Sequence, residues 1–311
     1  HNFTSEEEVI ELPNDIKISR LTADEINKIT DLCRDPFITD NESIRFNHDR
    51  FIIKTEIQYP IVINDRKKWE EITSAHFNDG KTPTQIAKNF FDNTILGIRC
   101  FKKSESYYSR LYIKSTNLNL FGYLFVNSGS CLSWPGNKCE IKRDKVNNLK
   151  NFLSIFSSEK NQKDIALQNA IRRLSYGIEK FRPEDKLIDF FIAFESLLLT
   201  FDTEKKGKGN KMGKRGGCFL RKAITDMKEN KISDIIRKSY EEIRGSVIHG
   251  RKLPTDIKIK NESLLLANLA QSLEEMLRIS IHNILEMKKD KRPTKDTGYW
   301  DDLFSERQQN K

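Results

Sequence analysis

The chain has 311 residues and a formal net charge of +9, from 54 lysines and arginines against 45 aspartates and glutamates. This length is sufficient for two domains, each with its own hydrophobic core, and the basic excess attracts polyanions such as RNA. The five cysteines form no C-x-x-C pair and have no histidine at zinc-ligand spacing, so we expect no metal site, no cofactor and no disulfide framework.

The start of the chain and the distribution of its apolar residues argue against secretion. Residues 4–8 are acidic, where a signal peptide would be basic and then apolar. No apolar run approaches the roughly 18 residues needed to cross a bilayer. We therefore expect a cytoplasmic protein that does not contact a membrane.

Residues 1–157 combine helix and strand signals. A capping box at residues 22–25 predicts the start of a short helix. Runs rich in β-branched and aromatic residues predict strands at 51–57, 94–101, 107–113 and 118–126. Residues 102–106 suit a hairpin turn between two of these strands. The pattern predicts an α+β domain in which sheet dominates.

Residues 158–290 show the period of helices, because apolar side chains recur at intervals of three or four. Helices are predicted at 167–181, 187–198, 232–247 and 261–287, and Pro183 separates the first two. Four principal helices with short connections predict an all-α helical bundle. Residues 291–311 are polar and charged, and we expect a loosely ordered tail there.

A basic, glycine-rich segment at 204–217 lies between the second and third of these helices. Its glycine spacing does not fit the Walker pattern, and Lys214 is followed by Arg, which argues against a nucleotide-hydrolysing site. Lysines interleaved with glycines predict a flexible arm that binds RNA phosphates without sequence preference, or a plain solvated loop. The candidate RNA-binding residues of this arm are Lys205, Lys206, Lys208, Lys211, Lys214 and Arg215.

The strongest chemical signal is the pair Arg244 and His249, with Gly250 directly after it. Glycine tolerates the left-handed conformation, so Gly250 predicts the end of a helix and leaves the imidazole at an open helix end. Positions five apart differ by about 140° around an ideal helix, so the two side chains should not lie side by side. The pair alone also fits a structural role, in which Arg244 meets a local carboxylate and His249 merely ends the helix.

Four segments of the C-terminal half resemble a known family in their order. They are residues 170–174, similar to its first core helix; 183–199, similar to the second; 212–220, similar to a short helix before the active site; and 240–250, similar to its closing Arg–His motif. The family is the HEPN superfamily, in particular its ApeA-like branch. The residue after the Arg is commonly Asn, Asp, His or Ser there, whereas this chain has Gly245, which offers no side chain to orient the ring of His249.

The resemblance implies a metal-independent RNA endonuclease of HEPN type that cleaves by transesterification at the 2′-hydroxyl. His249 would exchange protons with the 2′-hydroxyl or the leaving 5′-oxygen, and Arg244 would stabilise the phosphorane charge. Two copies would pack so that both pairs face one shared cleft, which implies a homodimer. Such proteins are associated with antiviral defence, abortive infection and growth arrest, and tRNA is a frequent target. The N-terminal domain would then be a sensor or regulatory domain that responds to a partner protein or a phage trigger.

Two further residues are candidates for the site. Glu195 lies on an apolar stripe, where an unpaired charge is costly, so we expect it to pair with Arg244, either to orient a catalytic Arg or as a structural ion pair. Tyr240, one turn before Arg244, either lines the cleft and contacts RNA or fills the core.

Two other functions remain open from the sequence. One is a catalytically silent HEPN protein that acts as an RNA-binding or dimerisation scaffold, which Gly245 favours. The other is the toxin of a toxin–antitoxin pair, held inactive by a partner encoded beside it.

Overall fold

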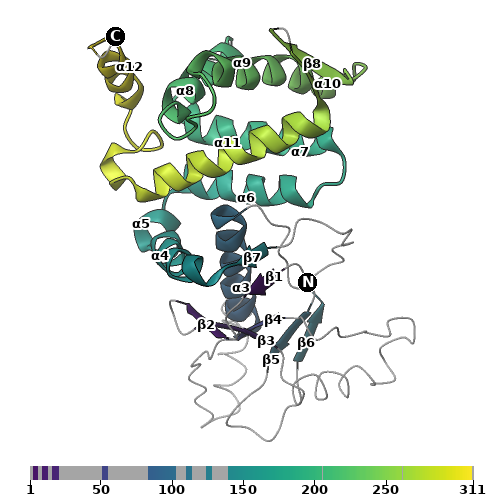
Figure 1. Ribbon diagram of the computed structural model, residues 1–311, viewed down its shortest axis with the longest axis vertical. Helices are drawn as coiled ribbons and strands as arrows, with labels where there is room; N and C mark the ends of the chain where they lie inside the picture. Colours follow the sequence, from purple (N-terminus) through teal and green to yellow (C-terminus); the bar gives the residue numbers. More distant parts are fainter. Residues whose placement is uncertain are drawn as a thin grey trace, which may run out of the picture. The chain divides into compact units, whose positions relative to one another are not determined.

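The computed structural model describes residues 3–5, 9–12, 16–20, 51–54, 83–102, 110–113, 124–127, 139–204, 206–260 and 262–309. The chain divides into two compact units, His1–Ser154 and Ile155–Lys311. The described residues are predominantly helical, with a few short strands (Figure 1).

Short strands pair in the first unit. The strands β2 (Val9–Leu12), β3 (Ile16–Arg20) and β4 (Phe51–Lys54) form an antiparallel sheet in which Ile18 lies opposite both Ile10 and Ile53. The strands β5 (Arg110–Ile113) and β6 (Leu124–Asn127) are antiparallel, and β1 (Phe3–Ser5) pairs with β7 (Cys139–Ile141) in parallel. The strand predictions are therefore confirmed over parts of 51–57, 107–113 and 118–126. The capping box at 22–25 and residues 103–106 of the expected turn lie outside the described residues.

The prediction of a strand at 94–101 is wrong, because these residues form the last turns of the helix α3 (Pro83–Phe101). Their β-branched and aromatic composition favours a strand only weakly, since tertiary packing overrides such a preference. In the helix, Ile95 and Ile98 lie on one face and are both buried. A short 3₁₀ helix, η1 (Arg143–Lys145), and α4 (Val146–Phe156) follow β7.

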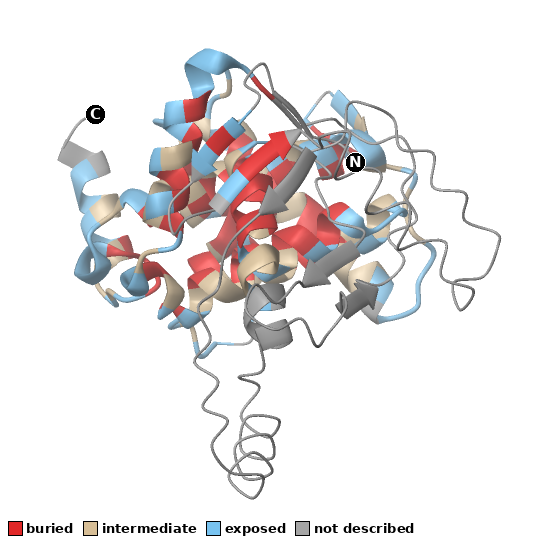
Figure 2. Ribbon diagram, turned by 90° about the horizontal axis from the view of Figure 1, so that it is seen from below, coloured by how far each residue is buried: buried red, intermediate tan, exposed pale blue. Residues whose placement is uncertain are grey.

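The second unit is built around a helical hairpin of α6 (Ile165–Glu179) and α7 (Pro183–Leu198), preceded by the short α5 (Glu159–Gln162). Pro183 is the first residue of α7, where its fixed φ suits a helix start. The apolar stripes predicted for both helices are confirmed, except that Phe181 is exposed. The helix α11 (Leu266–Glu286) packs on this helical hairpin (Figure 1). The buried residues of α6, α7 and α11 form the interior of the second unit (Figure 2).

The glycine-rich segment is not a flexible arm over most of its length, because residues Lys208–Leu220 form the helix α8. Its glycines allow a close approach to α9 (Glu229–Ser239), against which α8 packs. A Cβ added at Gly213 would lie 2.7 Å from the backbone oxygen of Ser233, and one at Gly217 would lie 2.9 Å from that of Glu229. The spacing of these glycines therefore serves helix packing. Lys205 lies outside the described residues.

The predicted fourth helix begins later than expected. Residues Glu262–Leu265 form the strand β9, which pairs with β8 (Asp256–Ile259) in a hairpin that the sequence analysis missed. Lys260, in the two-residue turn, has a φ of 55°, as a tight hairpin turn requires. Leu265, expected on the apolar face of the helix, is instead exposed.

The C-terminal segment differs from the loosely ordered tail that its composition suggested. It contains a 3₁₀ turn, η3 (Lys289–Lys291), and the helix α12 (Tyr299–Gln309), in which Trp300 is buried. Arg292 is fully buried and contacts Asp164, with Nη1 and Oδ2 3.5 Å apart, and Asn161. Asp164 is also the N-cap of α6. The buried ion pair of Arg292 and Asp164 thus links the C-terminal segment to the start of α6.

The close contact between α8 and α9 gives a first prediction. Replacing Gly213 with Ala is expected to destabilise the protein by about 1 to 3 kcal/mol, because the added methyl group would force the helices apart. This loss exceeds the gain of at most about 1 kcal/mol from the higher helix propensity of Ala. Chemical denaturation followed by circular dichroism measures the difference.

Gly245→Ala is the matched control. Gly245 is also helical, but a Cβ added there would meet no atom of the described residues within 4 Å, so this variant should be at least as stable as the parent. If Gly213→Ala is as stable as Gly245→Ala, the glycines of α8 are not needed for helix packing.

Candidate functional site

Residues 240–250, which carry Arg244 and His249 and are called the Arg–His segment, follow α9 without a break and contain an irregular turn. One turn of π-helix, η2 (Tyr240–Arg244), leads into the short α10 (Gly245–Ile248). A π turn holds an extra residue, so the residues after it are rotated by about 100° from their places in a continuous α-helix. This rotation explains why Val247, predicted to continue the buried stripe, is 37% exposed, whereas Ile236 and Ile243 are fully buried.

His249 lies directly at the end of α10, and the end has the hydrogen bonds of a Schellman motif. The backbone N–H of Arg251 donates to the oxygen of Ser246 at 2.8 Å, and that of Gly250 donates to the oxygen of Val247 at 3.3 Å. Gly250 has a φ of 61°, as predicted from its position. The motif fixes the backbone of His249, whose side chain is exposed.

The pairing of Glu195 with Arg244 that the sequence suggested is present. Arg244 Nε lies 3.0 Å from Glu195 Oε1, and the hydroxyl of Tyr240 donates to the same oxygen at 2.8 Å. Lys208, at the start of α8, donates to the other carboxylate oxygen at 3.3 Å. We call Glu195, Lys208, Tyr240 and Arg244 the Glu195 cluster. It joins α7, α8 and η2, and no sequence motif indicated the contribution of Lys208.

The ring of Tyr240 fills the core, which is one of the two alternatives left open by the sequence, and Tyr240 also lines a pocket. Its ring is buried and meets Phe191 edge to face, with the ring centroids 5.6 Å apart, while its hydroxyl reaches Glu195. The Arg244 guanidinium lies over the same ring, 5.2 Å from its centroid. Burial and the hydrogen bond to Glu195 raise the pKa of the Tyr240 phenol well above its ordinary value, so the hydroxyl remains a donor at neutral pH.

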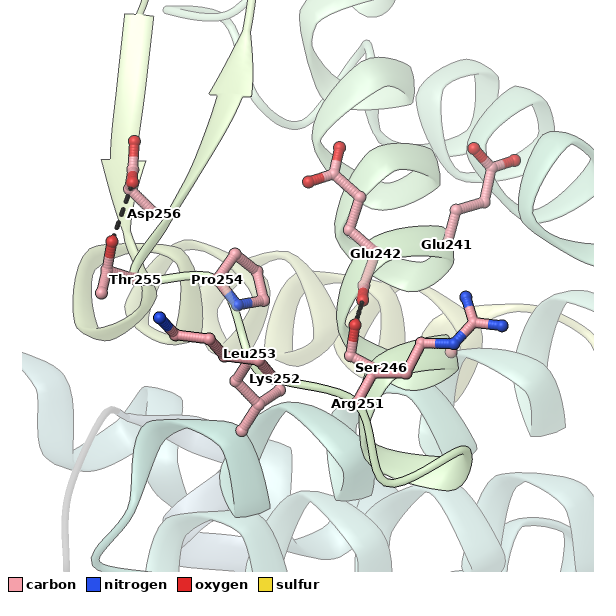
Figure 3. A pocket seen from close by; sticks show the side chains of 10 residues that line it. Glu241, Glu242, Ser246, Arg251, Lys252, Leu253, Pro254, Thr255 and Asp256 are labelled. Atoms are coloured by element: carbon pink, nitrogen blue, oxygen red, sulfur yellow. Dashed lines mark hydrogen bonds between the residues drawn. The ribbon is translucent and has the colours of Figure 1, made fainter.

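Two pockets flank η2. One, of about 500 Å³, is lined by Gly207, Lys208, Gly209, Tyr240, Glu241 and Arg244, and we call it the α8 pocket. The other, of about 580 Å³, lies beside Gly245 and the loop that precedes β8 (Figure 3). In Figure 3, Glu241 and Glu242 stand on the helix at one side and Thr255 and Asp256 at the other. Neither pocket is lined by His249.

Most of the predicted RNA-binding cations have partners within the protein. Lys211 lies 3.1 Å from Asp202 and 2.6 Å from Glu204, and Arg215 contacts Asp202 and donates to the backbone oxygen of Leu198. Lys214 lies over the ring of Phe304, 4.4 Å from its centroid. Lys206 is exposed.

Lys211 and Arg215 together lower the pKa of the Asp202 carboxyl. Burial alone would raise the pKa of this carboxyl, but the hydrogen bonds and charges of Lys211 and Arg215 outweigh burial and lower it. The Glu204 and Asp202 carboxylates in turn raise the pKa of Lys211. These ion pairs hold the segment before α8 against the helix.

Within the described ranges, no group of three or more His, Cys, Asp or Glu side chains is arranged to hold a metal ion. No helix in the described part combines the length and the apolar character that crossing a bilayer requires. Among the described residues, no hydrogen bond or ion pair joins Arg244 to His249. In comparisons with known proteins, no family model matches the chain, and no curated protein or solved structure shows significant similarity to it.

The hydrogen bond of Tyr240 gives a second prediction. Tyr240→Phe should lower the free energy of unfolding by about 0.5 to 1.5 kcal/mol near neutral pH. The folded-state pKa is raised above the unfolded value of about 10, so this contribution is present below about pH 10 and lost as the pH rises further.

Urea denaturation of the parent and Tyr240→Phe at several pH values measures this effect. The difference in unfolding free energy should be constant from about pH 6 to about pH 9 and shrink above about pH 10. A difference that stays constant through about pH 11 would contradict the assignment of this hydrogen bond.

Proposed function

We propose that this protein is a metal-independent RNA endonuclease of HEPN type, with its active site around Arg244 and His249. The observation that supports this most directly is the state of Arg244. Its Nε is held by Glu195, whereas no hydrogen bond of Nη1 or Nη2 is found among the described residues. A guanidinium fixed in this way can present two parallel donors to a phosphate.

The proposed reaction is transesterification within the RNA. The 2′-oxygen attacks phosphorus while the bond to the 5′-oxygen breaks, which leaves a 2′,3′-cyclic phosphate and a 5′-hydroxyl. His249 would take the proton of the 2′-hydroxyl or supply one to the leaving oxygen. Arg244 would stabilise the charge that develops on the phosphorane. DNA lacks the 2′-hydroxyl and would not be cleaved.

Glu195 and Tyr240 act as positioning residues in this proposal. The carboxylate holds Nε, and the Tyr240 hydroxyl and Lys208 hold the carboxylate, so the guanidinium is oriented before RNA arrives. Such preorganisation is the main way in which fixed charges lower an activation barrier.

The site would be completed by a second copy of the chain. No hydrogen bond or ion pair joins Arg244 to His249 in the described part of the chain, and His249 is exposed at the end of α10. A homodimer that brings two such ends together would place the Arg and His of both protomers around one phosphate. In this proposal the protein is a cytoplasmic effector of antiviral defence or growth arrest, with tRNA among its targets, and the first unit responds to a partner protein or phage trigger.

The third prediction concerns catalysis. In buffer containing EDTA, the parent should cleave total RNA, with 2′,3′-cyclic phosphate ends at the products. His249→Ala and Arg244→Ala should each lower the cleavage rate by at least about 100-fold, because each loses a group that acts in the transition state. Denaturing gels and end-group analysis measure the outcome.

Matched controls are available on other surfaces of the second unit. His282→Ala removes a half-exposed histidine of α11, and Arg182→Ala removes an exposed arginine before α7, so both should cleave at the parent rate. Loss of activity in EDTA that magnesium restores would argue for metal-dependent chemistry. Parent-like rates in both active-site variants would refute the assignment of Arg244 and His249.

The fourth prediction concerns assembly. If the cleft takes groups from two protomers, a mixture of inactive Arg244→Ala and His249→Ala proteins should regain part of the activity, because a mixed dimer retains one Arg and one His. Light scattering on the parent should show a dimer at the concentrations at which it cleaves RNA. A strict monomer whose activity is linear in protein concentration would refute the composite site.

One observation favours a second candidate, a catalytically silent scaffold that binds RNA or mediates dimerisation. The residue after Arg244 is Gly245, and a Cβ built there would meet no described atom within 4 Å, so nothing at this position orients His249. A scaffold would bind RNA without cutting it. Binding of total RNA without new termini would therefore select the scaffold over the endonuclease.

A further inference from the structure

We propose that the α8 pocket binds a phosphate group of the RNA backbone, and that Glu241 occupies part of this subsite when RNA is absent. The inference rests on the proposed function for the identity of the ligand as RNA. It goes beyond that function in assigning a phosphate contact to Lys208 and the first turn of α8, beside Arg244.

The α8 pocket is lined by two cations, Lys208 and Arg244, and one carboxylate, Glu241, and the cations keep donors that have no partner among the described residues. Lys208 uses one of its donors on Glu195, and Arg244 uses only Nε there, so the remaining N–H groups can bind a second anion. Both side chains are about one-third exposed, which leaves them accessible from solvent. The volume of about 500 Å³ lies within the range typical of small-ligand sites.

The first turn of α8 adds backbone donors to these side chains. Gly207, the N-cap, has a φ of 70° and provides no side-chain cap, so the first N–H groups of the helix lack an intrahelical partner. Gly207 is exposed, whereas Gly209 is buried against the Glu241 side chain. The helix dipole also favours negative charge at this end.

The Glu241 carboxylate already lies at the first turn of α8. A Cβ added at Gly209 would be 2.8 Å from Glu241 Oε1, so the Glu241 side chain covers the first turn of α8. Its other oxygen lies 3.7 Å from Arg237, which can retain the carboxylate if it moves aside. Glu241 therefore marks a position that attracts an anion and would compete with phosphate for it.

Two other pockets fit a phosphate less well. The pocket of Figure 3 is lined by Glu241, Glu242 and Asp256 as well as by Arg251 and Lys252, so its carboxylates outnumber its cations. A third pocket, beside Phe201 and Ile165, has Lys295 as its one charged lining residue. The α8 pocket is the one of these that combines two cations with a helix start.

Calorimetric titration of the 311-residue protein with inorganic phosphate tests the subsite. Lys208→Gln should weaken phosphate binding by at least about fivefold, because a charge-assisted hydrogen bond is lost. Glu241→Gln should strengthen it by about two- to fivefold, because a competing charge is removed. Lys222→Gln is the matched control, since it removes an equal charge from an exposed position beyond the far end of α8, and its affinity should equal that of the parent.

A second measurement uses 2′-O-methyl RNA, which lacks the attacking hydroxyl and is not cleaved. In fluorescence anisotropy, Lys208→Gln should reduce the slope of log affinity against log salt by about 0.7, the value for one phosphate contact on a single strand. With cleavable RNA the same variant should raise KM more than it lowers kcat. Thermal unfolding of each variant confirms that it is folded.

The outcomes separate this inference from the proposed function. Equal phosphate affinity in the parent, Lys208→Gln and Glu241→Gln would refute the subsite even if RNA is cleaved. An unchanged salt slope with 2′-O-methyl RNA would refute its assignment to a polynucleotide phosphate. Phosphate binding with the expected variant pattern, but without cleavage of RNA, would support the subsite and refute the endonuclease.

Discussion

The arrangement of the candidate site depends on one carboxylate, that of Glu195. It stands on α7, largely shielded from solvent, and accepts hydrogen bonds or ion pairs from Lys208, Tyr240 and Arg244. A carboxylate in such a place is costly unless it is neutralised, and two cations more than neutralise it. Both cations also line the α8 pocket, together with Glu241. The same contact therefore stabilises the junction of α7, α8 and η2 and leaves it attractive to an anion.

The glycines of α8 determine how closely α8 can pack against α9. Side chains at Gly213 and Gly217 would collide with the backbone of α9, so only glycine permits the observed approach. Through this approach the start of α8 reaches η2, where Glu241 lies against Gly209. A composition that suggested flexibility instead produces a tightly packed helix pair, and with it the position of Lys208.

The sequence was sufficient to predict those features that depend on periodicity or on a local backbone rule. The stripes of α6 and α7 and the left-handed Gly250 follow from such rules. The partner of Glu195 could be inferred as well, because burial of a charge demands one. The helical state of 94–101 depends on tertiary packing, which local preference does not encode. The resemblance indicated a short helix at 212–220, whereas α8 already begins at Lys208. The π turn, which moves Val247 to the surface, shows no local signal that we recognise.

The buried contact between Arg292 and Asp164 limits where the second unit can be truncated without loss of stability. Asn161, Asp164 and Arg292 are all fully buried, and Thr294 also donates to Asp164 at 2.7 Å. A protein shortened to residue 290, the bundle boundary inferred from the sequence, would leave the Asp164 carboxylate without its guanidinium and threonine partners. Removing one member of a buried pair costs about 3 to 5 kcal/mol, a large share of the stability of an ordinary domain. Residues 291–300 therefore belong to the folding unit of the helices, since Trp300 is buried as well, and limited proteolysis should find them resistant.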